Sequence, residues 1–194
     1  MTRPRDLLAL LMALPCAPAF AADPIRVVNE GGIREEWTLP ADFKLAIPVY
    51  PAAYATQQAE ACVAIGYLIN PDGSTSDFAL LKNWTSAKVP SRATREYWSA
   101  FAQASAQALS QWRFQPRPEI QAVRPVYTVA TLLFAAQTPQ LRDRCAIPDL
   151  AARLRELRRG SGSQRNTDLD LYDRLDLDRL RPAREQSQPP GAGA

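Results

Sequence analysis

The feature that most constrains the fold is the order of elements between Pro48 and Phe134. Two alternating apolar runs flank the sequence Asn70-Pro71-Asp72-Gly73, a pattern typical of a tight turn between two strands. A segment with helical periodicity follows, and a last apolar run ends at Phe134. This order predicts an α+β fold: a small three-stranded antiparallel sheet with one packed helix, in the order β-β-α-β.

Residues 62–69 are predicted to form the first strand, with large side chains at every second position: Val63, Ile65, Tyr67 and Ile69. The residues between them are also largely apolar, so we expect this strand at the centre of the sheet with both faces covered. The returning strand is expected over residues 76–82. A loop over residues 83–90 would then make Trp84 a candidate contact residue.

Residues 91–113 change period and predict the helix. Apolar or small side chains recur at three- and four-residue steps, which is the spacing of one buried stripe: Trp98, Phe101, Ala102, Ser105, Leu109 and Trp112. Pro116 and Pro118 end the helix. The last strand is expected over residues 125–134, which are rich in β-branched and aromatic side chains.

The N-terminal residues 1–21 resemble a secretory signal peptide. Arg3 and Arg5 precede a leucine-rich run, and Ala19-Phe20-Ala21 fits a cleavage site with small residues. The apolar stretch is shorter than the roughly 20 residues that a membrane-spanning helix needs. We therefore expect an exported, periplasmic protein with no membrane span after cleavage.

Three further segments surround the predicted domain of residues 48–134. Residues 22–47 are an N-terminal arm, with a possible hairpin of strands at 25–29 and 33–39; the alternative is an irregular arm lying on the domain. Residues 135–160 are a C-terminal segment with a short helix at 148–159. Residues 161–194 are expected to be a linker, a marginal helix at 168–180 and a disordered tail.

The composition narrows the possible functions. The chain has no histidine, which excludes Ser–His and Cys–His catalysis and histidine-containing metal sites. The chain without residues 1–21 has a net charge of about +2, which argues for neither nucleic acid nor a membrane surface as partner. We therefore expect no enzyme, no catalytic residue, no metal and no cofactor, and the sequence offers no residues for the alternative of an uncharacterised enzyme.

Taken in order, the motifs of this region resemble the C-terminal domain of TonB-type energy transducers. The matching features are Tyr50-Pro51, the Asp72-Gly73 turn, the sequence Trp112-Arg113-Phe114-Gln115-Pro116 at the helix end, and a closing strand from Pro125-Val126 to Phe134. Transducers of this family have an anchor helix and a long Pro-rich spacer. This chain instead has a short signal-like segment and a short lead-in, which is the N-terminal arm of residues 22–47. The resemblance therefore implies a stand-alone periplasmic relative.

The resemblance also implies a mode of binding. In this family an extended segment of an outer-membrane receptor pairs with an exposed strand, usually the last one, whose unpaired N–H and C=O groups it satisfies. The equivalent candidate edge here consists of Val126, Tyr127, Thr128, Val129, Ala130, Thr131, Leu132 and Leu133. Alternatively, the N-terminal arm or the C-terminal segment covers this edge, or the edge pairs in a homodimer. A different function on the same fold would be that of a TolA-like structural or envelope-assembly factor.

Residues 22–194 contain two cysteines, Cys62 and Cys145. An even number in an exported chain suggests one disulfide, and the alternative is two free thiols. In the implied topology the first and last strands are antiparallel neighbours, so the start of one lies near the end of the other. Cys62 opens the first strand and Cys145 follows the last, so we predict a disulfide that holds the C-terminal segment over the sheet.

Overall fold

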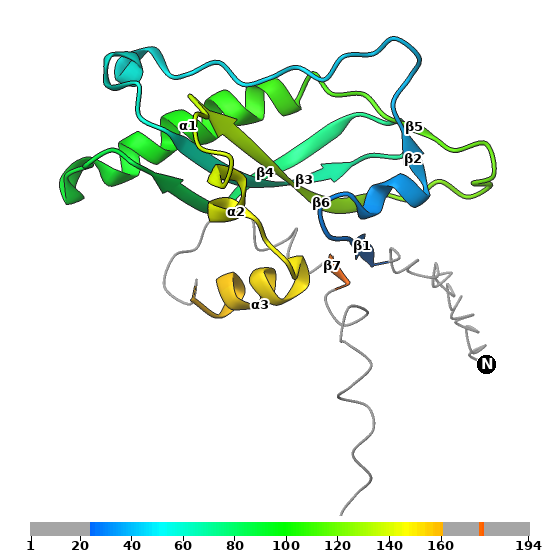
Figure 1. Cartoon of the computed structure of the whole chain (residues 1–194). Helices are drawn as coiled ribbons and strands as arrows, with labels where there is room; N and C mark the ends of the chain where they lie inside the picture. The colour runs from blue at the N-terminus through cyan, green and yellow to red at the C-terminus, as the bar shows by residue number, and fades with distance from the viewer. Residues whose placement is uncertain (1–23, 161–174, 177–194) are drawn as a thin grey trace, which may run out of the picture.

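The computed structural model describes residues 24–160 and 175–176 (Figure 1). Its main sheet has the strand order β4-β3-β6-β1-β7. In chain order these strands are β1 Ile25–Val27, β3 Ala61–Ile69, β4 Thr75–Thr85, β6 Val126–Phe134 and β7 Leu175–Asp176. A second, two-stranded sheet joins β2 Trp37–Thr38 to β5 Gln115–Pro116. The α-helices are α1 Thr94–Leu109, α2 Leu141–Cys145 and α3 Leu150–Gly160. Short 3-10 helices lie at Gly32–Glu35, Ala52–Gln57 and Ser91–Ala93.

The predicted α+β class is confirmed. Strands β4, β3 and β6 form an antiparallel unit with β3 in the middle, and α1 connects β4 to β6 as expected. The sheet is larger than the three strands predicted, because β1 adds to β6 in parallel and β7 adds to β1 in parallel. These additions come from the two ends of the chain, so the core motif itself is unchanged.

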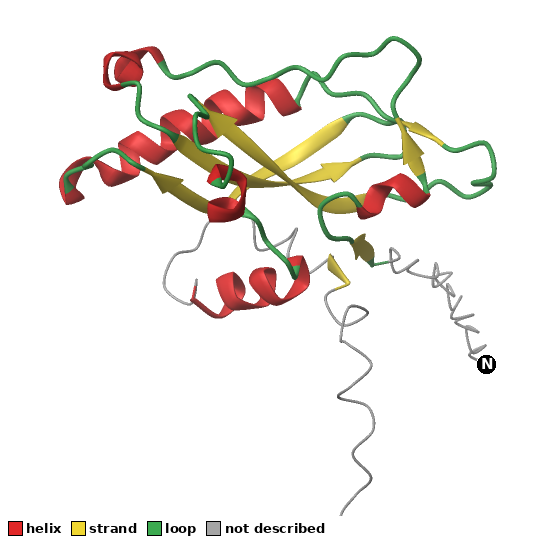
Figure 2. Ribbon diagram, in the orientation of Figure 1, coloured by secondary structure: helices red, strands yellow, loops and turns green. Residues whose placement is uncertain are grey.

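Helices cover both faces of the sheet (Figure 2). One face of β3 packs beneath α1, where Phe101 and Leu109 are fully buried. The other face packs against α3, where Leu150 and Leu154 are fully buried. All nine residues of β3 are buried, which confirms that this strand is central and covered on both sides.

The predicted turn has the expected chemistry. Gly73 adopts a left-handed φ of 78°, and its N–H donates to the Asn70 carbonyl at 2.8 Å. The Asp72 carboxylate accepts hydrogen bonds from both the N–H and the hydroxyl of Ser74, at 2.9 and 2.6 Å. The turn also touches the segment after α1, because the Phe114 N–H donates to the Gly73 carbonyl at 2.9 Å.

Strand β4 and helix α1 differ from their predicted bounds. Strand β4 continues through Thr85, so Trp84 lies in a strand opposite Cys62 and not in a loop. It packs near the disulfide, with the Arg144 guanidinium 5.2 Å from its ring centre. Helix α1 begins at Thr94, after a 3-10 turn, and buries Tyr97, which the predicted stripe did not include.

The hairpin considered for the N-terminal arm is wrong. Strands β1 and β2 belong to different sheets, because β1 pairs with β6 whereas β2 pairs with β5. Each strand thereby buries its apolar side chains against the domain, notably Ile25, Val27 and Trp37. The alternative of an arm lying on the domain describes the structure. In the tail, Leu175 and Asp176 form a strand and not the helix expected there; the rest of 161–194 and the predicted signal peptide lie outside the described residues.

The predicted disulfide between Cys62 and Cys145 is present, with a Cα–Cα distance of 5.9 Å. Both cysteines are fully buried beside Leu141 and Leu133, so the bond fixes α2 at the start of β3. Among residues 24–160 and 175–176, no helix combines the length and the apolar character needed to cross a membrane.

Candidate functional site: the outer side of strand β6

The predicted binding edge begins inside the sheet. Val126 and Tyr127 of β6 lie opposite Arg26 and Val27 of β1, and the Val28 N–H donates to the Tyr127 carbonyl at 3.0 Å. The lead-in therefore covers the start of the candidate edge Val126–Leu133, which is one of the alternatives left open by the sequence. Any pairing of a partner with these first residues would require β1 to leave.

Backbone pairing along this side stops after Tyr127. Main-chain groups of alternate residues point to the same side of a strand, so those of Val129, Thr131 and Leu133 face the same way as the Tyr127 carbonyl. Within the described part of the lead-in, no main-chain group hydrogen-bonds to the main chain of β6 beyond Tyr127. Among residues 24–160 and 175–176, no neighbouring strand therefore closes the side of β6 from Val129 onward.

Glu30 occupies the next position along this side. Its carboxylate accepts hydrogen bonds from the N–H and from the hydroxyl of Thr131, both at 2.9 Å. Arg142, on α2, forms an ion pair with the same carboxylate. A side-chain oxygen thus stands where the carbonyl of a paired strand would accept the Thr131 N–H, and α2 holds it there.

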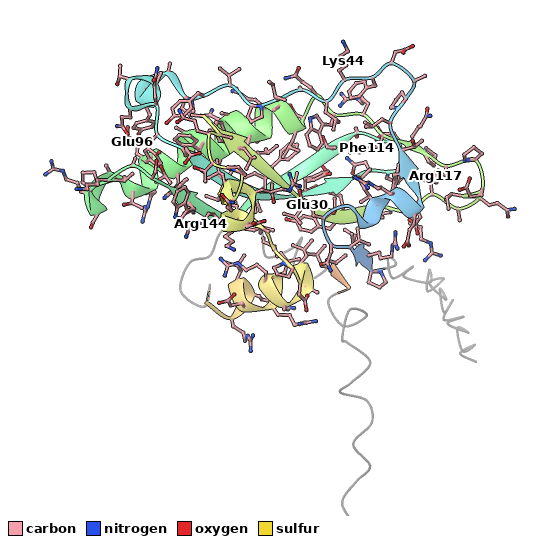
Figure 3. The ribbon with its side chains drawn as sticks, in the orientation of Figure 1. Glu30, Lys44, Glu96, Phe114, Arg117 and Arg144 are labelled. Carbon is pink, nitrogen blue, oxygen red and sulfur yellow. A yellow bond between two sulfur atoms is a disulfide. The ribbon has the colours of Figure 1, made fainter. Side chains whose placement is uncertain are left out.

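A groove of about 800 Å³ opens between β6 and the lead-in. Thr128, Val129 and Ala130 line it from β6, at the place where strand pairing stops. Most of the other lining residues are apolar or aromatic: Ile33, Trp37, Leu39, Leu45, Tyr67, Trp112 and Phe114. Figure 3 shows Phe114 and Arg117 beside the small sheet, with Glu30 lying between them and α2. The volume falls within the range of pockets that hold ligands of moderate size.

Three arginine side chains line this groove. Arg34, Arg117 and Arg142 line it, against the single carboxylate of Glu30. The Arg117 Nε donates to the Arg34 carbonyl at 2.6 Å, which ties the segment after α1 to the lead-in. The rim is therefore net positive and favours a ligand with negative charge.

Two buried polar groups also belong to the groove. Burial, and to a lesser extent the negative charge of Glu30, raise the pKa of the Tyr67 phenol far above its ordinary value, so its hydroxyl stays protonated. The indole N–H of Trp37 is buried and has no hydrogen-bond partner among the described residues. The groove thus combines an apolar lining with an unused donor, a combination that suits a segment bearing carbonyl groups.

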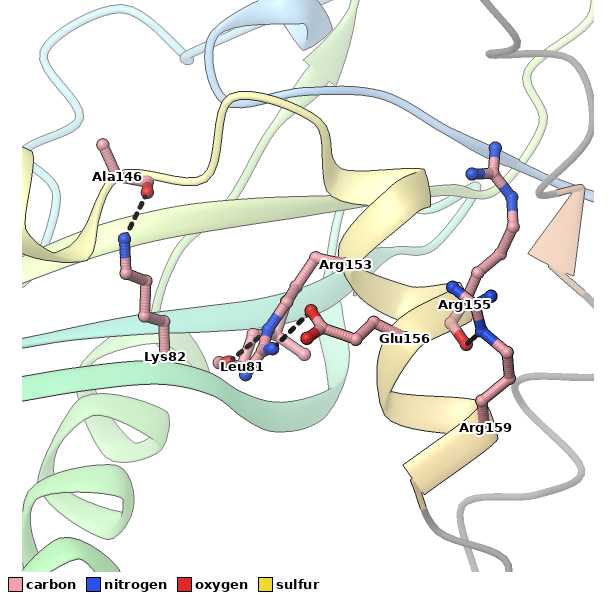
Figure 4. Close-up of polar contacts among 7 residues, drawn as sticks. All are labelled: Leu81, Lys82, Ala146, Arg153, Arg155, Glu156 and Arg159. Atoms are coloured by element: carbon pink, nitrogen blue, oxygen red, sulfur yellow. Dashed lines mark hydrogen bonds and ion pairs between the residues drawn. The ribbon is translucent and has the colours of Figure 1, made fainter.

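The opposite edge of the sheet, along β4, is protected. The pairing of β4 with β3 has two register shifts, and such bulges hinder the addition of another strand. Arg153 of α3 donates from Nε and Nη2 to the Leu81 carbonyl, at 2.9 and 2.7 Å, and Lys82 donates to the Ala146 carbonyl at 3.0 Å (Figure 4). The Leu81 carbonyl of β4 is therefore already bonded to α3 and is not free to pair with an added strand.

The solved structures to which the chain is similar include TonB C-terminal domains. For that of Pseudomonas aeruginosa the sequence identity is 25% and the TM-score 0.37, over 50% of this chain and 85% of the other. For that of Helicobacter pylori the sequence identity is 21% and the TM-score 0.32, over 47% of this chain and 71% of the other. For the TonB2 protein of Vibrio anguillarum the sequence identity is 19% and the TM-score 0.32, over 65% of this chain and 95% of the other. No protein-family model and no curated protein matches the chain.

The residues that shape this site were only partly predicted. Thr128, Val129 and Ala130 of the predicted edge line the groove, and Leu133 instead packs against the disulfide region. Glu30, Arg34, Arg117 and Arg142 were missed. They lie in the lead-in, after α1 and in α2, and no local pattern in the sequence connects these segments.

Proposed function

We propose that this chain is an exported protein-interaction module, resembling TonB C-terminal domains, that binds an extended segment of a partner protein alongside β6. The predicted signal peptide and the disulfide support a periplasmic location, because disulfides persist in oxidising compartments. The motifs from Tyr50-Pro51 to Phe134 and the β-β-α-β order support the resemblance. The proposal covers a binding role and no catalytic one.

The observation that carries the proposal is the hydrogen bond that the Thr131 N–H donates to the carboxylate of Glu30. This N–H belongs to a strand interior, where the partner is ordinarily the carbonyl of another strand. A side chain can leave such a position by rotation, whereas a paired strand must be peeled away. Glu30 therefore closes the edge in a way that a bound segment can reverse.

The bound segment would pair with the main chain of β6 from Val129 to Leu133. Its alternate side chains would enter the groove against Phe114 and Trp112, while acidic side chains would meet Arg34 and Arg117. Strand β1 would stay in place, because its pairing ends at Tyr127. This arrangement narrows the predicted edge to its second half.

Photo-cross-linking of the full chain in its own cells tests the proposal. A photoreactive amino acid replaces Arg34 or Leu39, which line the groove, and Arg95, which is exposed on α1, serves as the control. We expect the same partner from both groove positions and not from Arg95. Capture of outer-membrane receptors would favour a transport role, and capture of structural envelope proteins alone would favour the TolA-like role.

The captured segment is then synthesised as a peptide and tested by hydrogen exchange. We expect the peptide to slow exchange at the amides of Val129, Thr131 and Leu133, and to leave the β4 amides unchanged. A peptide that binds without protecting these three amides, or that protects β4 instead, would contradict addition at β6.

A further inference from the structure

Three aromatic rings that contact one another line the groove beside β6. Tyr67 comes from β3, whereas Trp112 and Phe114 come from the segment after α1. The Tyr67 ring stacks on Phe114 with 6.5 Å between the ring centres. Trp112 meets Tyr67 edge-on at 6.0 Å and Phe114 at 6.3 Å. These three residues, here called the aromatic cluster, offer ring faces and edges to an apolar or aromatic body in the groove.

Two of the three arginines that line the groove carry a charge that no carboxylate offsets. Arg142 is paired with Glu30, whereas Arg34 and Arg117 form no ion pair with any described residue. The hydrogen bond from the Arg117 Nε to the Arg34 carbonyl places the Arg117 guanidinium beside Arg34. Guanidinium groups bind carboxylates with two parallel hydrogen bonds, so this part of the groove favours a carboxylate.

The same groove contains a buried donor that lacks an acceptor. Trp37 lines the groove and is 3% exposed, and its indole N–H has no hydrogen-bond partner among the described residues. Buried polar groups are nearly always paired, because an unpaired one loses its hydration without compensation. An acceptor oxygen that reaches Trp37 from the groove would relieve this cost. The donor therefore indicates a ligand that carries oxygen atoms.

We propose that the groove binds a small organic acid, a molecule with one carboxylate on an apolar or aromatic body. The body lies against the aromatic cluster, and the carboxylate meets Arg34 and Arg117. The groove volume of about 800 Å³ is in the range that small ligands occupy. The rings of the aromatic cluster are at most 9% exposed, so a compact ligand reaches them more readily than the folded surface of another protein does.

The acid would occupy the space that the side chains of a partner segment are proposed to enter. Binding of the acid and binding of the segment are therefore expected to exclude each other. This competition rests on the proposed function, whereas binding of the acid alone does not. An acidic side chain of the segment is the other source of the same chemistry, and the experiments below separate the two sources.

Titration of the full chain with phenylbutyrate, followed through the indole N–H signals in NMR spectra, tests the site. Trp37 and Trp112 line the groove. The other two tryptophans, Trp84 and Trp98, do not line it and serve as internal controls. We expect the first pair of signals to shift with a dissociation constant of about 1 mM or less, and the second pair to stay in place. Phenylbutanol, which has the same body without charge, and acetate, which lacks the body, should each bind at least about tenfold more weakly.

Arg34→Gln isolates the contribution of the charge. The side chain is exposed, so the unfolding midpoint should not change. We expect this variant to bind phenylbutyrate about tenfold more weakly than wild type and to bind phenylbutanol equally well. Arg95→Gln, exposed on α1, is the matched control and should bind both compounds as wild type does.

Three results would overturn the proposal: equal affinity of the wild-type chain for phenylbutyrate and phenylbutanol, equal affinity of wild type and Arg34→Gln for phenylbutyrate, or shifts confined to Trp84 and Trp98. A chain that captures a partner by cross-linking but does not bind phenylbutyrate would overturn this inference alone, and would leave the partner segment as the source of the carboxylate. A chain that binds phenylbutyrate but captures no partner would contradict the proposed function alone.

Discussion

Glu30 and Thr131 are joined by two hydrogen bonds although 101 residues separate them in the sequence. The carboxylate satisfies a strand N–H that no other strand reaches among the described residues, and Arg142 holds the carboxylate from α2. The contact therefore links the lead-in, the last strand of the central unit and the segment after it. It also decides whether the second half of the predicted edge is open.

Glu30→Gln is expected to loosen this link. The amide keeps one acceptor oxygen but loses the charge that strengthens both hydrogen bonds and the ion pair, which should cost about 1–2 kcal/mol of unfolding free energy. Hydrogen exchange at the Thr131 amide should accelerate, and a peptide identified by cross-linking should bind more tightly. Glu35→Gln, exposed on the same arm, is the control and should change neither quantity.

Gly73→Ala is expected to destabilise the domain by about 2–4 kcal/mol. Gly73 has a φ of 78°, and a Cβ atom there would lie 1.8 Å from the Phe114 carbonyl oxygen. Gly31 has a φ of 84°, but a Cβ atom there would meet no other atom within 4 Å, so Gly31→Ala isolates the backbone strain and should cost less. Urea unfolding of both variants measures the difference, and equal losses would rule out the steric contribution.

Replacement of both Cys62 and Cys145 by alanine is expected to cost about 4 kcal/mol, because the disulfide closes a loop with a sequence separation of 83. The denaturation midpoint should fall, and exchange should accelerate first in α2, which the bond holds against β3. Wild-type protein treated with a reductant should approach the stability of the double variant. Unchanged exchange in α2 would show that its packing alone suffices.

Glu60 is expected to make stability depend on pH in the acidic range. The Thr138 hydroxyl and the main-chain N–H groups of Gln137 and Thr138 donate to its carboxylate and hold its pKa below the ordinary 4.5. Because the folded-state pKa is the lower one, this contribution is present above the unfolded-state value and is lost as the pH falls through the folded-state value. Glu60→Gln should therefore be less stable than wild type at neutral pH, and the difference should vanish in strong acid. Unfolding curves of the two proteins at several pH values provide the measurement.

The central unit could be predicted because its signals are local. Gly73 supplies the turn, the alternation through Val63 and Ile65 marks a strand covered on both faces, and the three- and four-residue spacing around Phe101 marks the helix. Each signal extends over a few residues, and hydrophobic burial then leaves one consistent packing. The pairing of Cys62 with Cys145 follows from that topology.

The ends of the chain could not be predicted in the same way. Strand β1 has three residues and β7 two, too few for an alternation to be recognised. Strand β1 pairs in parallel with the main chain on the outer side of β6, and this pairing depends on the tertiary packing of the two segments. Trp84 is a strand residue for a similar reason, because β4 continues along β3 toward the disulfide.

By itself, the sequence determined the α+β class, the β-β-α-β order and the cysteine pairing, because turn chemistry and apolar periodicity act over short stretches. The tertiary structure alone decided the state of the β6 edge. Whether that edge is open depends on where Val28 and Glu30 lie relative to Tyr127 and Thr131. Such hydrogen bonds between segments about a hundred residues apart form only when packing brings the segments together.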